Sequence, residues 1–237
     1  MPIAPCASLV VYAGIIGLAL AVATGICAMV YRASPKEARR FAVIVAGWAS
    51  LTLCLALAGV FARVDLRPPP LLLILVGLAI GVPLLARSNI GAALASTSPW
   101  ILVGLQSFRL PLELVMHQAA QEGTMPMQMT FGAGGLNYDI VTGATAVVLA
   151  SIMRRRDVPR VLVLAWNVLG SVLLSIVVVV AVASLPIFAA FGTDAAALNT
   201  WVLFAPFVWL PALLVGSAAL GHIVLFRALI APPARSK

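Results

Sequence analysis

Long apolar runs separated by short polar connections dominate the chain. The runs lie at 8–31, 41–62, 70–87, 99–120, 138–153, 161–187 and 201–226. A helix needs about 20 predominantly apolar residues to cross the hydrocarbon core of a bilayer. The pattern therefore predicts an all-α, polytopic integral membrane protein, in which residues 1–237 form a single seven-helix transmembrane bundle.

The segment 88–98 interrupts this pattern, because it is small in side-chain size and only weakly apolar. We expect a loop, an interfacial helix or a re-entrant piece there, and the number of spans depends on which of these it forms. The preceding run, 70–87, is short and contains Pro83.

The composition supports a membrane protein and argues against a nucleic-acid partner. Hydrophobic residues make up 63% of the chain and charged residues only 9%, whereas a soluble domain carries roughly 25% charged residues. The formal net charge is +8, but the basic residues stand between apolar runs and not on one soluble face. The expected partner is the lipid bilayer, and the expected location is the inner membrane of a cell.

The basic residues also predict an orientation, because cytoplasmic connections are enriched in lysine and arginine. With seven spans, twelve of the 15 lysines and arginines fall on one side: Arg32, Lys36, Arg39, Arg40, Arg87, Arg154, Arg155, Arg156, Arg160, Arg227, Arg235 and Lys237. The opposite side holds only Arg63 and Arg67. We therefore expect the N-terminus outside and the C-terminus in the cytoplasm.

One apolar run carries three ionisable side chains at helical spacing. Arg109, Glu113 and His117 stand four residues apart in the sequence FRLPLELVMHQAA, so they share one flank of a helix. Ionisable groups at bilayer depth are costly and usually face a cavity, a partner helix or a ligand. Two interpretations remain open: an Arg109–Glu113 pair that locks the helix to its neighbours, or a proton or substrate relay that opens outward. Pro111, between the two charges, is expected to kink the helix.

The connection that follows places two further polar residues at the start of the next run. Either Asn137 or Asp139 can cap that helix, and a carboxylate is favoured at a helix N-terminus. Asp139 also enters the bundle near the depth expected for His117, so the two could form a carboxylate–imidazole pair at an outer vestibule. Asn137 and Asp139 therefore join Arg109, Glu113 and His117 as candidates for a ligand or proton pathway.

A metal site is the alternative use of these residues. Glu113, His117 and Asp139 are the only metal-ligating types expected at one depth, which is a small set for zinc. If the last helix begins near Trp201, His222 lies about 30 Å deeper, at the inner boundary, and cannot share a ligand with His117. We predict no cofactor. Both lysines, Lys36 and Lys237, lie outside the runs, which excludes a retinal Schiff base inside the bundle.

Three parts of the sequence stand out as motifs: FR-x3-E with GLNYDIVTGATA between Ser107 and Ala146, AWNVLG at 165–170 and APFVWLPALL at 205–214. These stretches resemble a family of small bacterial seven-span inner-membrane proteins that are labelled as uncharacterised. The resemblance covers about the last 130 residues. It implies a bacterial inner-membrane protein and brings no activity, ligand or catalytic residue.

Three classes of function fit these observations. The leading interpretation is a small transporter, a channel or a ligand-binding membrane protein with an outward-facing polar pocket, which uses Arg109, Glu113 and His117 on a small molecule or ion. A membrane-embedded, metal-dependent enzyme or redox protein is the second, although the sequence favours a non-enzyme. The third is a membrane scaffold or assembly factor without a substrate.

Overall fold

The computed structural model describes residues 2–230, and within them all regular structure is helical, with no strand. Arg235 and Lys237, which the sequence assigns to the cytoplasmic side, lie outside the described residues. The α-helices, in chain order, are α1 (Leu9–Ala33), α2 (Pro35–Leu57), α3 (Pro70–Arg87), α4 (Asn89–Ala95), α5 (Pro99–Leu105), α6 (Arg109–Gln121), α7 (Ile140–Met153), α8 (Arg160–Ala183) and α9 (Gly216–Ile230).

Local sequence signals set the starts of the first helices. Ser8 caps α1, and its side chain accepts a hydrogen bond from Val11 N. Ser34 ends α1 and begins α2, where its side chain accepts from Glu37 N and Pro35 occupies the first turn. A serine followed three residues later by glutamate, with proline at the first helical position, is typical of a helix start. The α1–α2 connection is therefore short, and the two helices pack side by side.

The apolar run at 99–120 forms two α-helices joined by a turn of 3₁₀-helix. This turn, η1 (Gln106–Phe108), separates α5 from α6. Pro111 has no N–H and cannot form the α-helical bond to the carbonyl of Ser107, which lies within η1. The irregularity therefore falls one turn before the proline, and Arg109 is the first residue of α6.

The last apolar run differs most from the expected span at 201–226. A 3₁₀ turn, η4 (Trp201–Leu203), is followed by non-helical residues, and continuous helix begins only with the π-helical segment η5 (Leu210–Val215), which leads into α9. Elsewhere, α2 begins at Pro35 and not at 41, and the segment 88–98 contains the short helix α4.

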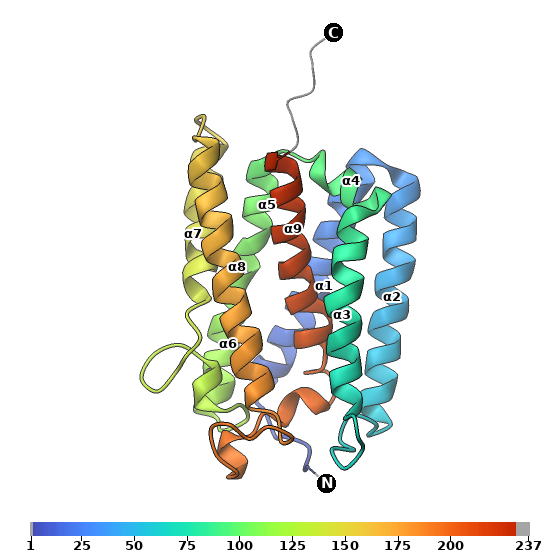
Figure 1. Ribbon diagram of the computed structural model, residues 1–237, viewed down its shortest axis with the longest axis vertical. Helices are drawn as coiled ribbons and strands as arrows, with labels where there is room; N and C mark the ends of the chain where they lie inside the picture. The colour runs from blue at the N-terminus through green and yellow to red at the C-terminus, as the bar shows by residue number, and fades with distance from the viewer. Residues whose placement is uncertain (1, 231–237) are drawn as a thin grey trace.

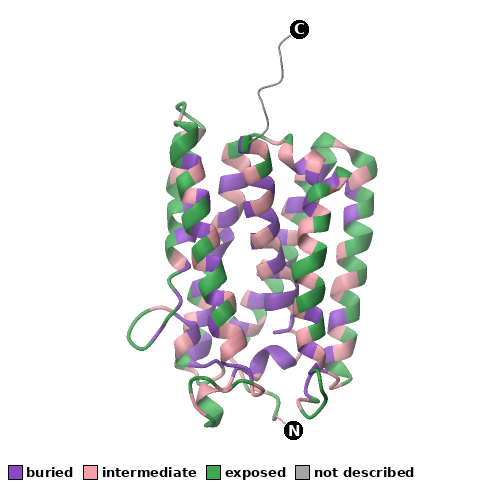
Figure 2. Cartoon of the chain, viewed as in Figure 1, coloured by how far each residue is buried: buried purple, intermediate pink, exposed green. Residues whose placement is uncertain are grey.

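Helix α9 lies in the middle of the bundle, between α8 and α3 in the view of Figure 1. It packs against α3, α4, α5 and α8. Figure 2 shows buried residues concentrated along α9 and exposed residues along the outer faces of α2, α3, α7 and α8. About half of the residues in Leu210–Ile230 are buried, a larger share than in the other long apolar helices. Polar side chains on α9 are therefore removed from the surface.

The outer faces of the bundle are strongly apolar. Exposed side chains there include Leu9, Val43, Val161 and Val179, each more than half exposed. Five helical segments are long and apolar enough to cross a membrane: Leu9–Ala33, Pro35–Leu57, Pro70–Arg87, Arg160–Ala183 and Leu210–Ile230. Helix α7 is apolar but shorter. Apolar side chains that face outward on long helices are compatible with contact with a lipid bilayer.

The two ends of the bundle differ in charge and in loop length. The α1–α2, α3–α4 and α7–α8 connections lie at the end where α9 terminates (top in Figure 1). There Arg227 Nη1 donates to the carbonyl of Ala86 at 2.7 Å. At the opposite end, Ser8 N donates to Glu122 Oε2 at 2.9 Å, a bond that holds the pKa of Glu122 below its usual value. The longer connections, 122–139 and 184–209, gather at this second end.

Candidate functional site

Arg109 forms the centre of a buried polar cluster. Its side chain is 1% exposed, and its guanidinium faces the carboxylate of Asp139 at the start of α7. Nε lies 2.5 Å from Oδ2, and Nη2 pairs with Oδ1. The pairing is bidentate, which is the strongest geometry available to arginine and a carboxylate. Arg109 therefore joins the start of α6 to the start of α7.

The same guanidinium also contacts His222 on α9. Arg109 Nη1 lies 2.7 Å from His222 Nε2. Asn167 on α8 holds the other side of the imidazole, with 2.7 Å between His222 Nδ1 and Asn167 Oδ1. Asn167 Nδ2 donates in addition to the backbone carbonyl of His222 at 3.0 Å. Four helices, α6, α7, α8 and α9, thus contribute to one hydrogen-bonded group.

Glu113 joins this group through Asn137. Asn137 Nδ2 donates to Glu113 Oε2 at 2.8 Å and to the carbonyl of Met129 at 3.1 Å. The amide oxygen of Asn137 accepts from Asp139 N at 2.9 Å. Glu113 is 2% exposed and Asn137 fully buried. The connected residues Glu113, Asn137, Asp139, Arg109, His222 and Asn167 are called the buried network below.

Two glycines allow the helices to approach closely at the buried network. A Cβ on Gly143 of α7 would lie 2.2 Å from the backbone nitrogen of Leu110, next to Arg109. A Cβ on Gly170 of α8 would lie 2.6 Å from His222 Cε1. Neither position has space for a larger side chain in this arrangement. The short distances from Arg109 to Asp139 and His222 depend on this close packing.

Arg109 and Glu113 contribute to the network, but not as the direct pair that their spacing suggests. Arg109 is engaged with Asp139 and His222, and no ion pair joins it to Glu113 among residues 2–230. Glu113 instead accepts a hydrogen bond from the neutral amide of Asn137. An arginine side chain is long enough to reach another helix, so spacing along one helix did not identify its partner.

His117 lies apart from Asp139. Its Nδ1 is 3.2 Å from Thr130 Oγ1, and its ring stacks on Phe131 with 4.6 Å between ring centroids. Asp139 precedes the first residue of α7, but its side chain makes no capping bond because it turns to Arg109. His117 and Asp139 therefore do not form the expected carboxylate–imidazole pair. His117 contacts the 122–139 connection, and Asp139 contacts the guanidinium of Arg109.

The alternative metal site is not supported by the arrangement of its three residues. Glu113, His117 and Asp139 have separate partners, and in the described part of the chain no group of three or more His, Cys, Asp or Glu side chains could hold a metal ion. The structure also leaves Cys6, Cys27 and Cys54 as free thiols.

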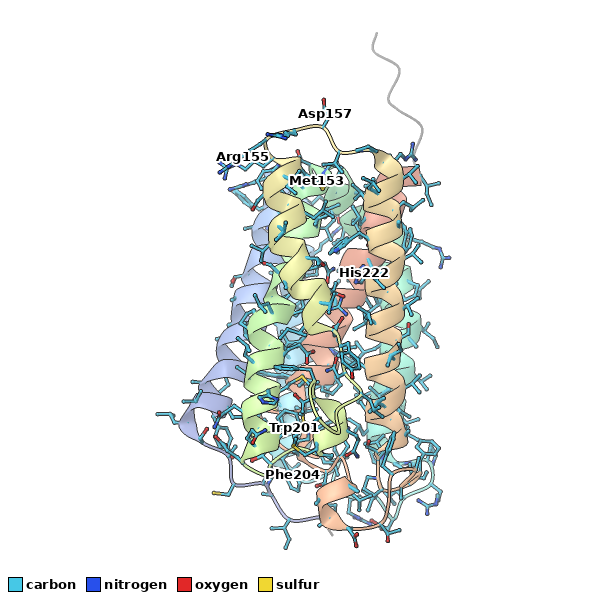
Figure 3. The ribbon with its side chains drawn as sticks, turned by 90° about the vertical axis from the view of Figure 1, so that its left-hand side faces the viewer. Met153, Arg155, Asp157, Trp201, Phe204 and His222 are labelled. Atoms are coloured by element: carbon cyan, nitrogen blue, oxygen red, sulfur yellow. The ribbon has the colours of Figure 1, made fainter. Side chains whose placement is uncertain are left out.

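His222 and Asn167 belong to the network but were not among the site residues predicted from the sequence, although Asn167 was expected to form a hydrogen bond between helices, as it does with His222. His222 was expected at the inner boundary because the last helix was assumed to begin near Trp201. Since the residues before Leu210 are not continuous helix, His222 lies nearer the middle of the bundle. Figure 3 shows it between the end that carries Arg155 and Asp157 and the end that carries Trp201 and Phe204. In AWNVLG, Asn167 and Gly170 are three residues apart and so share one face of the helix. A polar group beside a glycine on one helix face was the available signal for a close polar contact with another helix.

Comparisons with known proteins give no further assignment. No family model matches the chain, and no curated protein or solved structure matches it.

Proposed function

We propose that the chain crosses a bacterial inner membrane seven times, with the N-terminus outside and the C-terminus in the cytoplasm. In this proposal α7 and the combined α5–α6 segment cross in addition to the five long apolar segments. The supporting observation is charge: the helix ends and connections at the end where α9 terminates carry Arg32, Lys36, Arg87 and Arg155. Positively charged connections favour the cytoplasmic side. The resemblance to seven-span inner-membrane proteins agrees with this arrangement.

We further propose that the buried network is the ion- or proton-handling centre of a small transporter or ligand-binding membrane protein. The observation that carries the proposal is the set of partners around the Glu113 carboxyl group. Arg109 is bound to Asp139 and His222, so Glu113 is a buried carboxyl group without a cation of its own. Intramembrane carboxyl and histidine groups that face a bundle interior are typical of proton relays and ion pathways.

Each residue has a distinct role in this proposal. Glu113 carries a proton, and Asn137 connects it to Asp139 through the bonds of its amide group. Arg109 neutralises Asp139 and is the positively charged group that would attract an anionic substrate. The network members are almost fully shielded from solvent, which corresponds to a closed state. His117, half-buried beside the 122–139 connection, lies on the route from the outer end to Glu113.

Charge movement in reconstituted membranes tests this function. The full-length protein is adsorbed as proteoliposomes on a solid-supported membrane and exposed to pH jumps and to a panel of small organic anions and cations. We expect transient currents from the wild type that are lost in Glu113→Gln, which removes the titratable group at nearly constant volume. Asp157→Asn, in the exposed connection between α7 and α8, is the matched control and should keep the currents.

A scaffold or assembly factor is the second candidate, and two contacts between α6 and α7 favour it. The bidentate Arg109–Asp139 pair and the close contact at Gly143 fix α6 against α7, as expected of a purely structural centre. The same experiment separates the two functions. A folded wild type that gives no current with any tested solute, or currents that survive Glu113→Gln unchanged, would reject the transport function and favour the scaffold.

A further inference from the structure

A groove between α7 and α8 opens on the outer surface of the bundle, on the side that faces the viewer in Figure 3. Helix α7 packs mainly against α5 and α6 and less against α8, so α7 and α8 are separated on their outward side. The groove has a volume of about 390 Å³ and runs between Val148 and Ile152 of α7 and Leu162 of α8. These three side chains are exposed, so the groove faces the lipid of a membrane that the bundle crosses.

The groove offers no free polar side chain to a ligand. Its two polar residues, Thr145 and Trp166, bond to each other, with 2.8 Å between Trp166 Nε1 and Thr145 Oγ1. The Thr145 hydroxyl donates to the carbonyl of Val141 at 2.6 Å. The other lining residues are alanine, valine, leucine and isoleucine. This lining favours a hydrocarbon chain, because a polar ligand would lose its hydrogen bonds to water there without replacing them.

Exposed arginines stand at one end of the groove. Arg155 N and Arg156 N both donate to the carbonyl of Ile152 at 2.9 Å, so both residues lie one turn beyond a residue that lines the groove. Arg155 is at the upper end of the bundle in Figure 3. The turn between α7 and α8 carries a single carboxylate, Asp157, and four exposed arginines: Arg154, Arg155, Arg156 and Arg160.

The charge of these arginines is not neutralised within the described part of the protein. No ion pair joins any of the four to an acidic side chain among residues 2–230. Arg154 lies over the ring of Trp100 at 5.6 Å, a contact that leaves its charge in place. At the α1–α2 turn of the same end, by contrast, Arg40 pairs with Glu37 at 2.8 Å. The α7–α8 turn therefore presents guanidinium groups that can bind an external anion.

An apolar groove that ends at a cluster of arginines matches a molecule with a hydrocarbon chain and an anionic head. Guanidinium groups bind phosphate through paired, charge-assisted hydrogen bonds, and basic clusters next to membrane helices attract anionic lipids. A lipid without net charge would fill the groove but gain little from the positive turn. A free phosphate ion would bind the arginines but leave the groove to other molecules. An anionic phospholipid uses both.

We propose that this groove binds an anionic phospholipid such as phosphatidylglycerol. One acyl chain lies along Val148, Ile152 and Leu162, and the phosphate lies at Arg155 and Arg156. The lipid belongs to the leaflet at the end where α9 terminates, which is the cytoplasmic leaflet in the proposed orientation. The site goes beyond the proposed transport function, because none of its contacts involves a side chain of the buried network.

Photolabelling of the full-length protein in phosphatidylcholine nanodiscs tests the proposal. The probe is phosphatidylglycerol with a diazirine on one acyl chain, and the matched probe is phosphatidylcholine with the same chain. We expect the phosphatidylglycerol probe to label peptides of α7 and α8, and unlabelled phosphatidylglycerol to displace it. Equal labelling of these peptides by both probes would identify ordinary surrounding lipid, and displacement by inorganic phosphate at constant ionic strength would identify a site for a free anion. Either result would overturn the proposal.

Two charge variants separate this site from general attraction of anionic lipid to the basic end. Arg155→Gln combined with Arg156→Gln should weaken binding of the phosphatidylglycerol probe at α7 and α8 roughly tenfold. Lys36→Gln combined with Arg39→Gln removes the same charge from exposed positions near the α1–α2 turn and should leave that labelling unchanged. An equal loss in both variants would show only a general attraction and would contradict a site between α7 and α8.

A change of volume tests the position of the acyl chain. Val148→Trp places a large side chain in the groove and should reduce labelling of α7 and α8 by the phosphatidylglycerol probe at least severalfold. Leu20→Trp, at an exposed position on α1, is the matched control and should have no effect. Unchanged labelling in Val148→Trp would mean that the chain does not lie in the groove.

Discussion

At the scale of single residues, the two ring nitrogens of His222 have opposite hydrogen-bonding roles. Arginine has donors and no acceptor, so His222 Nε2 must accept from Arg109. Asn167 presents its Oδ1 to Nδ1, because its Nδ2 is already bonded to the backbone carbonyl of His222. Nδ1 must therefore donate. The contacts define a neutral imidazole that carries its hydrogen on Nδ1.

Nitrogen-15 NMR of the imidazole rings checks this assignment. We expect the His222 signals of a protonated Nδ1 and an unprotonated Nε2, with His117→Gln used to assign the two histidines. Asn167→Leu removes both side-chain bonds and should lower the free energy of unfolding by about 1–3 kcal/mol. A hydrogen on His222 Nε2 would mean that Arg109 does not donate to this ring.

The sequence predicted part of this site at the residue level. Arg109 and Glu113 were identified because ionisable groups are rare in apolar runs, and Asn137 and Asp139 because they stand where the next helix begins; all four lie in the buried network. Their pairing could not be predicted, because helical spacing describes neighbours along one helix and the decisive contacts join different helices. His222 was misplaced for a different reason: its depth depends on where the helix that carries it begins.

At the scale of helices, close packing at glycine holds the network together. Next to Gly143, the nearest atoms to an added Cβ belong to the backbone of α6, which cannot move without displacing the helix. Next to Gly170, the nearest atoms belong to the side chains of His222 and Thr142, which can shift more readily than a helix backbone. The α6–α7 contact should therefore tolerate a methyl group less well than the α8–α9 contact.

Alanine substitutions test this order of sensitivity. Gly143→Ala and Gly170→Ala should each lower stability, by about 1–3 kcal/mol for an overpacked core, with the larger loss at Gly143. Gly25→Ala, at a position with open space on α1, is the control and should stabilise by roughly 0.5–1 kcal/mol through helix propensity. Thermal unfolding in detergent measures all three. Equal stability of Gly143→Ala and the wild type would show that α6 and α7 are further apart.

The helices themselves were more predictable than their ends. Apolar runs of sufficient length identified the positions of α1, α3 and α8, because a spanning helix satisfies its own backbone groups. The residues 201–209 are as apolar as a span but are not continuous helix. Pro206 and Pro211 were the signal for this break, yet proline is also tolerated inside membrane helices, so composition alone did not locate the helix start.

At the scale of the whole molecule, the basic residues are concentrated at one end of the bundle, so the two ends differ in charge. Arg154 lies over the ring of Trp100 at 5.6 Å, and Arg227 bonds to the end of α3. These contacts keep arginines from separate helices at one end of the bundle. An arrangement with that end in the cytoplasm satisfies the positive-inside rule.

Reporter fusions test the proposed orientation. Alkaline phosphatase fused after Lys237 should be inactive, and a fluorescent protein at the same position should fluoresce, because both then lie in the cytoplasm. Phosphatase fused after Asp65, in the connection between α2 and α3, should be active. Phosphatase activity after Lys237 would reverse the orientation and would place the 122–139 connection on the cytoplasmic side.

The partner of Arg109 is tested most directly by comparing two double substitutions in thermal unfolding. Arg109→Leu alone leaves Asp139 buried and unpaired and should cost about 3–5 kcal/mol. Adding Asp139→Leu removes the unpaired charge and should restore much of the stability, whereas adding Glu113→Leu should not. Recovery with Glu113→Leu, and none with Asp139→Leu, would contradict the Arg109–Asp139 pair and the network built on it.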